Sequence, residues 1–110
     1  MRCYLIDEIS LSGMEKIDRF LKENNLRSEM EKLFWVEIPK AYLNEKQSRH
    51  RKCQPYIFAI ELGYDWIKAE YFIRNSKDLR CSCSGYCNTK QRDFISDYME
   101  SVIEELNIRT

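Results

Sequence analysis

Two neighbouring apolar runs, Tyr56 to Leu62 and Trp66 to Arg74, constrain the fold more than any other feature of the sequence. The first run is nearly all apolar, and the second alternates between apolar and polar residues, as half-buried strands do. Because Gly63-Tyr64-Asp65 between them favours a turn, the sequence predicts a β-hairpin. One face of the second strand is then expected in the core, namely Ile67, Ala69, Tyr71 and Ile73. The other face carries Trp66, Lys68, Glu70, Phe72 and Arg74.

Shorter segments on both sides of the hairpin extend the predicted sheet. Arg2 to Ile9 and Leu33 to Ile38 have the length and composition of strands, and Pro39 ends the second because it cannot donate to a sheet ladder. Asn75 to Asp78 favours a turn, so Leu79 to Cys83 is predicted to return as a third antiparallel strand. Together these strands make a β-meander.

The remaining segments are predicted to be helical. Ser12 and Glu15 are spaced for reciprocal capping of a helix that ends near Asn24-Asn25, since asparagine tolerates the left-handed conformation at a helix C-terminus. Its apolar face is Met14, Ile17, Phe20 and Leu21. Asn88 or Thr89 caps a long final helix, whose inner face is Phe94, Ile95, Tyr98, Met99, Val102, Ile103 and Leu106.

A short helix is predicted over residues 44–53, because Asn44 with Gln47 resembles a capped start and Gln54-Pro55 stops a helix. The order of elements predicts an α+β fold: a mostly antiparallel sheet of about five strands, with two main helices packed on one face. A ferredoxin-like topology is related, but the final strand that it needs is missing. With 110 residues and no repeat or linker, residues 1–110 are expected to form a single domain.

Charge and cysteine content limit the classes of partner. Eighteen basic and eighteen acidic residues cancel, so nucleic acid is not an expected partner. Asp7 and Glu8 interrupt the first apolar run too early for a signal peptide or membrane span, which predicts a cytoplasmic protein. In that reducing compartment, five cysteines are expected to be free thiols or metal ligands rather than a disulfide framework.

The cysteines suggest a metal site. Cys81 and Cys83 are two residues apart, so they share one face of an extended segment, and the turn at residues 84–86 could bring Cys87 toward them. His50 and Cys53 are three residues apart and share one face of the short helix. Zinc takes four tetrahedral ligands, so the preferred set is His50, Cys53, Cys81 and Cys83, with Cys87 in reserve.

Two other interpretations of the thiols remain open. Inert cysteines in a reduced core are favoured over a metal site, because the spacing is not the paired Cys-x-x-Cys of known zinc folds. Alternatively, Cys87 precedes the cap of the last helix, whose dipole would lower the thiol pKa and make Cys87 a redox nucleophile, with Cys83 or Cys81 resolving. No catalytic motif of another enzyme class is present, so an enzyme is not the favoured class.

Two surfaces are candidates for partner binding. Lys46, Arg49, Arg51 and Lys52 form a local basic patch, for which a solvated helix face is the favoured interpretation. Trp66 and Phe72 on the outer face of the hairpin suit burial under a neighbouring loop, or a contact with a protein partner or a second copy of the chain, better than base stacking. The sequence thus predicts a small binding or interaction module, with a structural zinc site as one of the open interpretations of its thiols.

Overall fold

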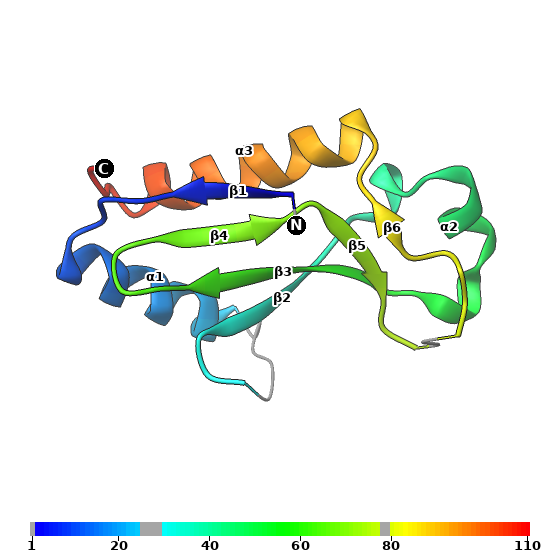
Figure 1. The fold of residues 1–110 in the computed structure, drawn as a ribbon, viewed down its shortest axis with the longest axis horizontal. Coiled ribbons are helices and arrows are strands. Elements are labelled where there is room, and N and C mark those ends of the chain that lie inside the picture. Colours follow the sequence, from blue (N-terminus) through cyan, green and yellow to red (C-terminus); the bar gives the residue numbers. More distant parts are fainter. Residues whose placement is uncertain (1, 25–29, 78–79) are drawn as a thin grey trace.

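The protein has an α+β fold built on an antiparallel sheet, as predicted (Figure 1). The computed structural model describes residues 2–24, 30–77 and 80–110. Over these residues the sheet has six strands: β1 (Cys3–Ile6), β2 (Leu33–Glu37), β3 (Tyr56–Leu62), β4 (Ile67–Glu70), β5 (Phe72–Asn75) and β6 (Gly85–Tyr86). Strand β3 is central. Strand β2 pairs with one edge of β3, and β4 and β5 pair with successive parts of the other edge. Strand β1 pairs with β4, and β6 pairs with β5.

The predicted hairpin is confirmed. Leu62 pairs with Ile67, and the Gly63 backbone N–H donates to the Trp66 carbonyl at 2.8 Å. A side chain at position 63 would have to displace the Trp66 ring, because a Cβ there would lie 1.9 Å from a ring atom.

The second strand of the hairpin bends at Tyr71, where β4 ends and β5 begins. Between the pairs Ile57–Arg74 and Ile60–Ala69, two residues of β3 face four of the second strand, which is a bulge. Even so, Ile67, Ala69 and Ile73 are buried as predicted, and Tyr71 is half-buried against the core. The bend directs β5 toward the end of the molecule where α2 (Glu45–Arg49) lies.

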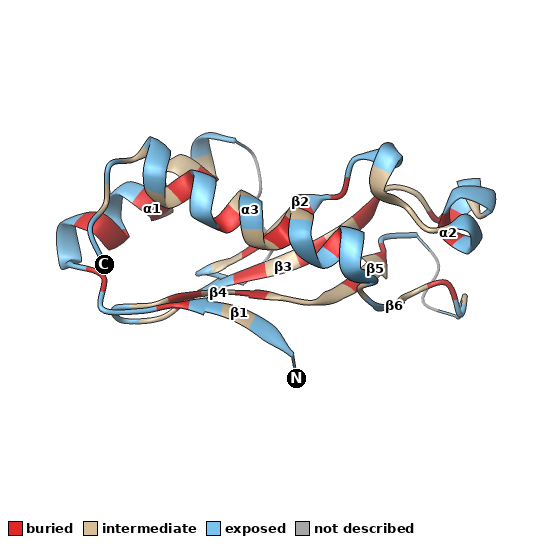
Figure 2. Ribbon diagram, turned by 90° about the horizontal axis from the view of Figure 1, so that it is seen from above, coloured by how far each residue is buried: buried red, intermediate tan, exposed pale blue. Residues whose placement is uncertain are grey.

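Two long helices, α1 (Leu11–Glu23) and α3 (Thr89–Glu105), cover one face of the sheet (Figure 2). Their apolar faces pack on the inner face of the strands and bury Ile17, Leu21, Ile95, Met99 and Val102. Such two-layer packing gives each element somewhere to bury its apolar side.

The caps of these helices agree with the predictions in one case and not in the other. Asn88 caps α3 in a reciprocal arrangement with Gln91. Helix α1 is capped by Ser10 rather than Ser12, because Ser10 is the residue with extended backbone and accepts from the Gly13 N–H at 3.1 Å. Asn24 ends α1 as expected, but its φ of −91° is not left-handed; its side-chain amide donates instead to the Phe20 carbonyl. Asn25 lies outside the described residues.

The short helix predicted over residues 44–53 is shorter than expected. The capping box of Asn44 and Gln47 is present, but α2 ends at Arg49. His50 leaves the helical conformation with φ −87° and ψ 65°, and a 3₁₀ helix, η2 (Arg51–Cys53), follows. Another 3₁₀ helix, η1 (Lys40–Tyr42), precedes α2.

The strand predicted over Leu79 to Cys83 is wrong where the structure describes it; Leu79 itself lies outside the described residues. The strand that pairs with β5 is β6, two residues further on. The reason is that the Ser82 and Cys83 carbonyls accept from the Lys46 and Gln47 side chains of α2 instead of from β5. Among the described residues, no helix has the length and apolar character needed to cross a membrane.

Candidate metal centre

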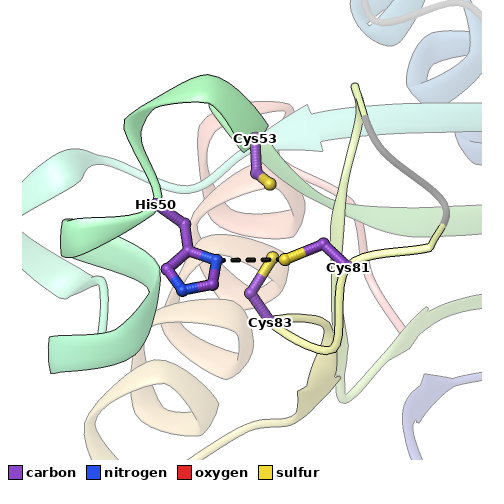
Figure 3. Close-up of side chains that lie close together, drawn as sticks. All are labelled: His50, Cys53, Cys81 and Cys83. Carbon is purple, nitrogen blue, oxygen red and sulfur yellow. Dashed lines mark hydrogen bonds between the residues drawn. The ribbon is translucent and has the colours of Figure 1, made fainter.

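Four side chains that could bind a metal converge at one end of the molecule (Figure 3). His50 and Cys53 come from the end of α2 and from η2, and Cys81 and Cys83 come from the loop between β5 and β6. Their ligand atoms all lie within 4.8 Å of one another, and His50 Nδ1 is 3.0 Å from Cys81 Sγ. Two distant segments of the chain therefore supply one nitrogen and three sulfur atoms.

The spacing of these atoms is close to that of a tetrahedral zinc site. Zinc–sulfur bonds of about 2.3 Å place the corners of a tetrahedron about 3.8 Å apart. Even donor atoms at the 4.8 Å limit are thus only about 1 Å beyond this separation. Small side-chain rotations would be enough to close the cluster around an ion.

The break in the helix at His50 presents the first pair of donors. The Cys53 backbone N–H donates to the His50 carbonyl at 3.0 Å, which closes the 3₁₀ turn that separates the two side chains. Cys53 and Cys83 are buried, with exposed fractions of 5% and 4%, whereas His50 and Cys81 are half-buried. The cluster consequently has an inner side against the core and an outer side near solvent.

Side-chain hydrogen bonds fix the two segments to each other. Lys46 Nζ donates to the Ser82 carbonyl at 3.2 Å and to its hydroxyl at 2.8 Å. Gln47 Nε2 donates to the Cys83 carbonyl at 3.4 Å, and Gln47 Oε1 accepts from Gln91 Nε2 at 2.8 Å. Gln47 and Gln91 are both buried, so these bonds satisfy amides that would otherwise be costly to bury. They tie α2 to the cysteine loop and to the start of α3.

Burial and neighbouring side chains shift the pKa values of the two buried thiols, Cys53 and Cys83, in opposite directions. Burial raises the pKa of Cys53 to about 12, and its contacts with Cys81 and Cys83 act in the same direction. Burial also acts to raise the pKa of Cys83, but the neighbouring side chains of Tyr56, Cys81, Cys53 and Asn75 outweigh it and lower that pKa below its ordinary value. Cys83 is therefore the buried sulfur best suited to carry negative charge.

Cys87 is not part of the group of four. Its backbone N–H donates to the Tyr71 carbonyl at 2.9 Å, which places Cys87 between the end of β6 and the cap of α3. The predicted lowering of its pKa is wrong: burial raises the pKa of Cys87 to about 11 and outweighs its own backbone N–H and Arg92. At neutral pH this environment favours the thiol over the nucleophilic thiolate.

Trp66 and Phe72, the predicted partner-binding residues, are both half-buried. Lys68 Nζ lies 5.4 Å from the centroid of the Trp66 ring. Phe72 packs edge-on against Tyr86, with centroids 5.2 Å apart. Each ring is thus partly covered by its own neighbours, and a role in partner binding stays a prediction.

The basic patch is partly used within the protein. Lys46 holds the cysteine loop, and Arg49 forms an ion pair with Glu45 one turn earlier on α2. Arg49, Arg51 and Lys52 are exposed, as on a solvated helix face, whereas Lys46 has a structural role.

Three polar residues support the cluster without any sign of this role in the sequence: Gln47, Tyr56 and Asn75. The capping pattern indicated Gln47 as a helix residue but not its bond to Cys83. Tyr56 and Asn75 are direct partners across β3 and β5, and only the strand register shows that they face the same side. No local pattern in the sequence would have found them.

No protein-family model matches the sequence, and no curated protein or solved structure matches the chain either. What the cluster can do follows from its donor atoms. Imidazole nitrogen and thiolate sulfur suit zinc and other soft or borderline cations, whereas magnesium and calcium require oxygen donors. The group of four could hold one metal ion of the first kind.

Proposed function

We propose that the protein is a small binding or interaction module in which a zinc ion on His50, Cys53, Cys81 and Cys83 holds one end of the fold together. The convergence of these four ligand atoms from two segments is the observation that supports it. Four protein ligands fill a tetrahedral site completely. Catalytic zinc sites keep one position open for water, so this donor set suits a structural ion.

A structural ion suits this part of the chain because it has little apolar core of its own. Residues 40–55 and 80–87, which we call the metal lobe, contain only short helices and one two-residue strand. The buried residues of the metal lobe are Gln47, Cys53 and Cys83. An ion that bound the folded lobe and not the unfolded chain would add its binding free energy to the stability of the lobe.

Zinc analysis and thiol mapping test this proposal. We expect about one zinc per chain after purification under reducing conditions, because four donors define one site. Cys53, Cys81 and Cys83 should be alkylated much more slowly with the ion bound than after a chelator removes it, while Cys3 and Cys87 should react at the same rate with and without chelator. Cys83→Ser should abolish stoichiometric zinc, and Cys3→Ser, the matched control on exposed β1, should retain it. Absence of metal, with the five thiols reacting regardless of chelator, would refute the site.

For the partner, a protein or a second copy of this chain is the proposal, on the face that carries Trp66 and Phe72. The aromatic rings are half-buried rather than enclosed, and the balanced charge of the chain does not favour a polyanion. Serine at both positions should weaken association in sedimentation or pull-down measurements with zinc content unchanged. Unchanged association would eliminate this face.

A donor set of free thiols suits the reducing cytoplasm, where we place the protein.

A further inference from the structure

Two buried polar side chains next to the metal centre, Tyr56 and Asn75, lie close to the same ligand, Cys83. Tyr56 begins β3 and Asn75 ends β5, and the two residues pair directly across the strands. Directly paired residues point to the same side of a sheet with their Cβ atoms about 5 Å apart. They are 1% and 5% exposed, and both approach Cys83.

The orientation of Asn75 is fixed by its other hydrogen bonds. Its side-chain oxygen accepts from the Lys77 backbone N–H at 3.2 Å, so its amide nitrogen faces the opposite way. That nitrogen donates to Cys83 Sγ at 3.4 Å and to Ser84 Oγ at 3.3 Å. Asn75 therefore offers an N–H group to the Cys83 sulfur.

Tyr56 supplies a second potential donor. Its hydroxyl is buried and has no hydrogen-bond partner among the residues that the structure describes. A tyrosine hydroxyl carries its proton at neutral pH and can donate it to a hydrogen bond. A buried hydroxyl without a partner costs free energy, and a neutral thiol is only a weak acceptor. A metal-bound thiolate on Cys83 would be a much stronger acceptor for this proton.

The four ligands consequently differ in their surroundings. Cys83 is buried beside two donors, whereas Cys81 is half-buried and faces His50 Nδ1. Hydrogen bonds to a thiolate stabilise its negative charge and lower its nucleophilicity, and burial excludes reagents.

We propose that Tyr56 and Asn75 are positioning residues for the metal: both donate to the Cys83 thiolate and make Cys83 the fixed ligand, so that ligand exchange and attack by electrophiles begin at Cys81. This inference rests on the proposed zinc site and adds the order in which that site opens.

The Tyr56→Phe variant tests the inference because it deletes only the hydroxyl. In metal-free protein the melting temperature should be unchanged or higher, since an unpaired buried hydroxyl is removed. In zinc-loaded protein, competition with a chromophoric chelator should show a 10- to 100-fold weaker affinity, the usual effect of losing a hydrogen bond to a metal ligand. With cobalt in place of zinc, the sulfur-to-metal charge-transfer band should move to lower energy, because an unsupported thiolate gives up an electron more easily.

Tyr71→Phe is the matched control. The Tyr71 hydroxyl is half-buried and bonded to Ser96 Oγ at 2.7 Å, away from the four ligands. Its removal should lower the melting temperature with and without metal, and should leave the zinc affinity and the cobalt spectrum unchanged.

Alkylation of zinc-loaded wild-type protein with iodoacetamide gives a second test that needs no variant. Each reaction forms a sulfur–carbon bond and expels iodide, and peptide mass spectrometry identifies the sulfur modified. Among the ligands, Cys81 should react first and Cys83 last. Tyr56→Phe should raise the rate at Cys83.

The outcomes separate the two proposals. If wild-type protein binds zinc but Tyr56→Phe leaves the affinity and the cobalt band unchanged, or if Cys83 reacts before Cys81, the positioning role is wrong and the metal site stands. If wild-type protein binds neither zinc nor cobalt, the proposed function fails, and this inference fails with it.

Discussion

The sheet with its two long helices and the metal lobe are stabilised in different ways. In the sheet and helices, large apolar side chains such as Phe58, Ile60, Ile95 and Met99 are fully buried. In the metal lobe, the buried side chains are an amide and two thiols, and contacts between segments are made by Lys46 and Gln47 to backbone carbonyls. Apolar burial therefore stabilises the sheet and the two long helices, whereas the metal lobe depends for its stability on specific polar contacts and, as we propose, on an ion.

Phe58→Ala should have the largest effect and tests the first half of this comparison. The side chain is 0% exposed in the centre of β3, and loss of a buried phenylalanine costs about 3–5 kcal/mol of unfolding free energy. Denaturant unfolding followed by circular dichroism measures it. Zinc stoichiometry of the folded fraction should not change, because the donors come from other segments. A loss below 1 kcal/mol would contradict the assignment of Phe58 to the core.

Metal removal should loosen the metal lobe and leave the sheet protected. With free zinc a hundredfold above its dissociation constant, binding contributes about 3 kcal/mol to the stability of the region that binds it. Hydrogen exchange with and without chelator should show faster exchange over residues 40–55 and 80–87 and little change in β3 or α1. Equal acceleration throughout the described chain would remove the distinction between the two regions.

Gln91→Leu should destabilise the junction between the regions. Gln91 is fully buried, and its amide donates to Gln47 Oε1 and to the Tyr42 carbonyl. Without it the Tyr42 carbonyl loses this donor and Gln47 Oε1 keeps only the Asn44 backbone N–H, which costs about 1–3 kcal/mol. Thermal unfolding and zinc affinity should both fall. Arg92→Leu, at an exposed position one residue further along α3, is the control and should change either quantity little.

Ser10→Ala should cost about 1 kcal/mol, the usual value for loss of an N-cap. Ser12→Ala should have a much smaller effect, because Ser12 lies inside α1 and does not cap it. Chemical denaturation of both variants compares them directly. A larger loss of stability in Ser12→Ala than in Ser10→Ala would instead identify Ser12 as the cap, as the sequence predicts.

The smallest effect concerns the pH dependence of Cys87. Its pKa in the folded protein is raised to about 11, so folding favours the protonated thiol. The resulting stabilisation is present below the ordinary thiol pKa and is lost as the pH rises toward 11. Cys87→Ala should therefore lose less stability than wild type between pH 9 and pH 11. A rate of Cys87 alkylation that levels off near pH 8.5 would show an ordinary thiol instead.

Most of the sheet and helices could be predicted because local patterns determine them. The turn at residues 63–65 and the alternation after it indicated the hairpin, and Asn88 with Gln91 indicated the start of α3. Errors occurred where two local signals competed or where tertiary contacts replaced them. Two nearby serines could cap α1, and the predicted strand up to Cys83 is replaced by a loop that bonds to α2.

Local sequence patterns were enough to predict the α+β class, the core faces of the strands and the set of side chains able to bind a metal. The folded chain was needed to show which of these side chains meet, because it excludes Cys87 and places Tyr56 and Asn75 beside Cys83. This difference follows from the range of the interactions. Periodicity and caps act over a few residues and are visible in any window of sequence, whereas the cluster joins segments 31 residues apart, His50 and Cys81, through a register and a bend set by the whole sheet.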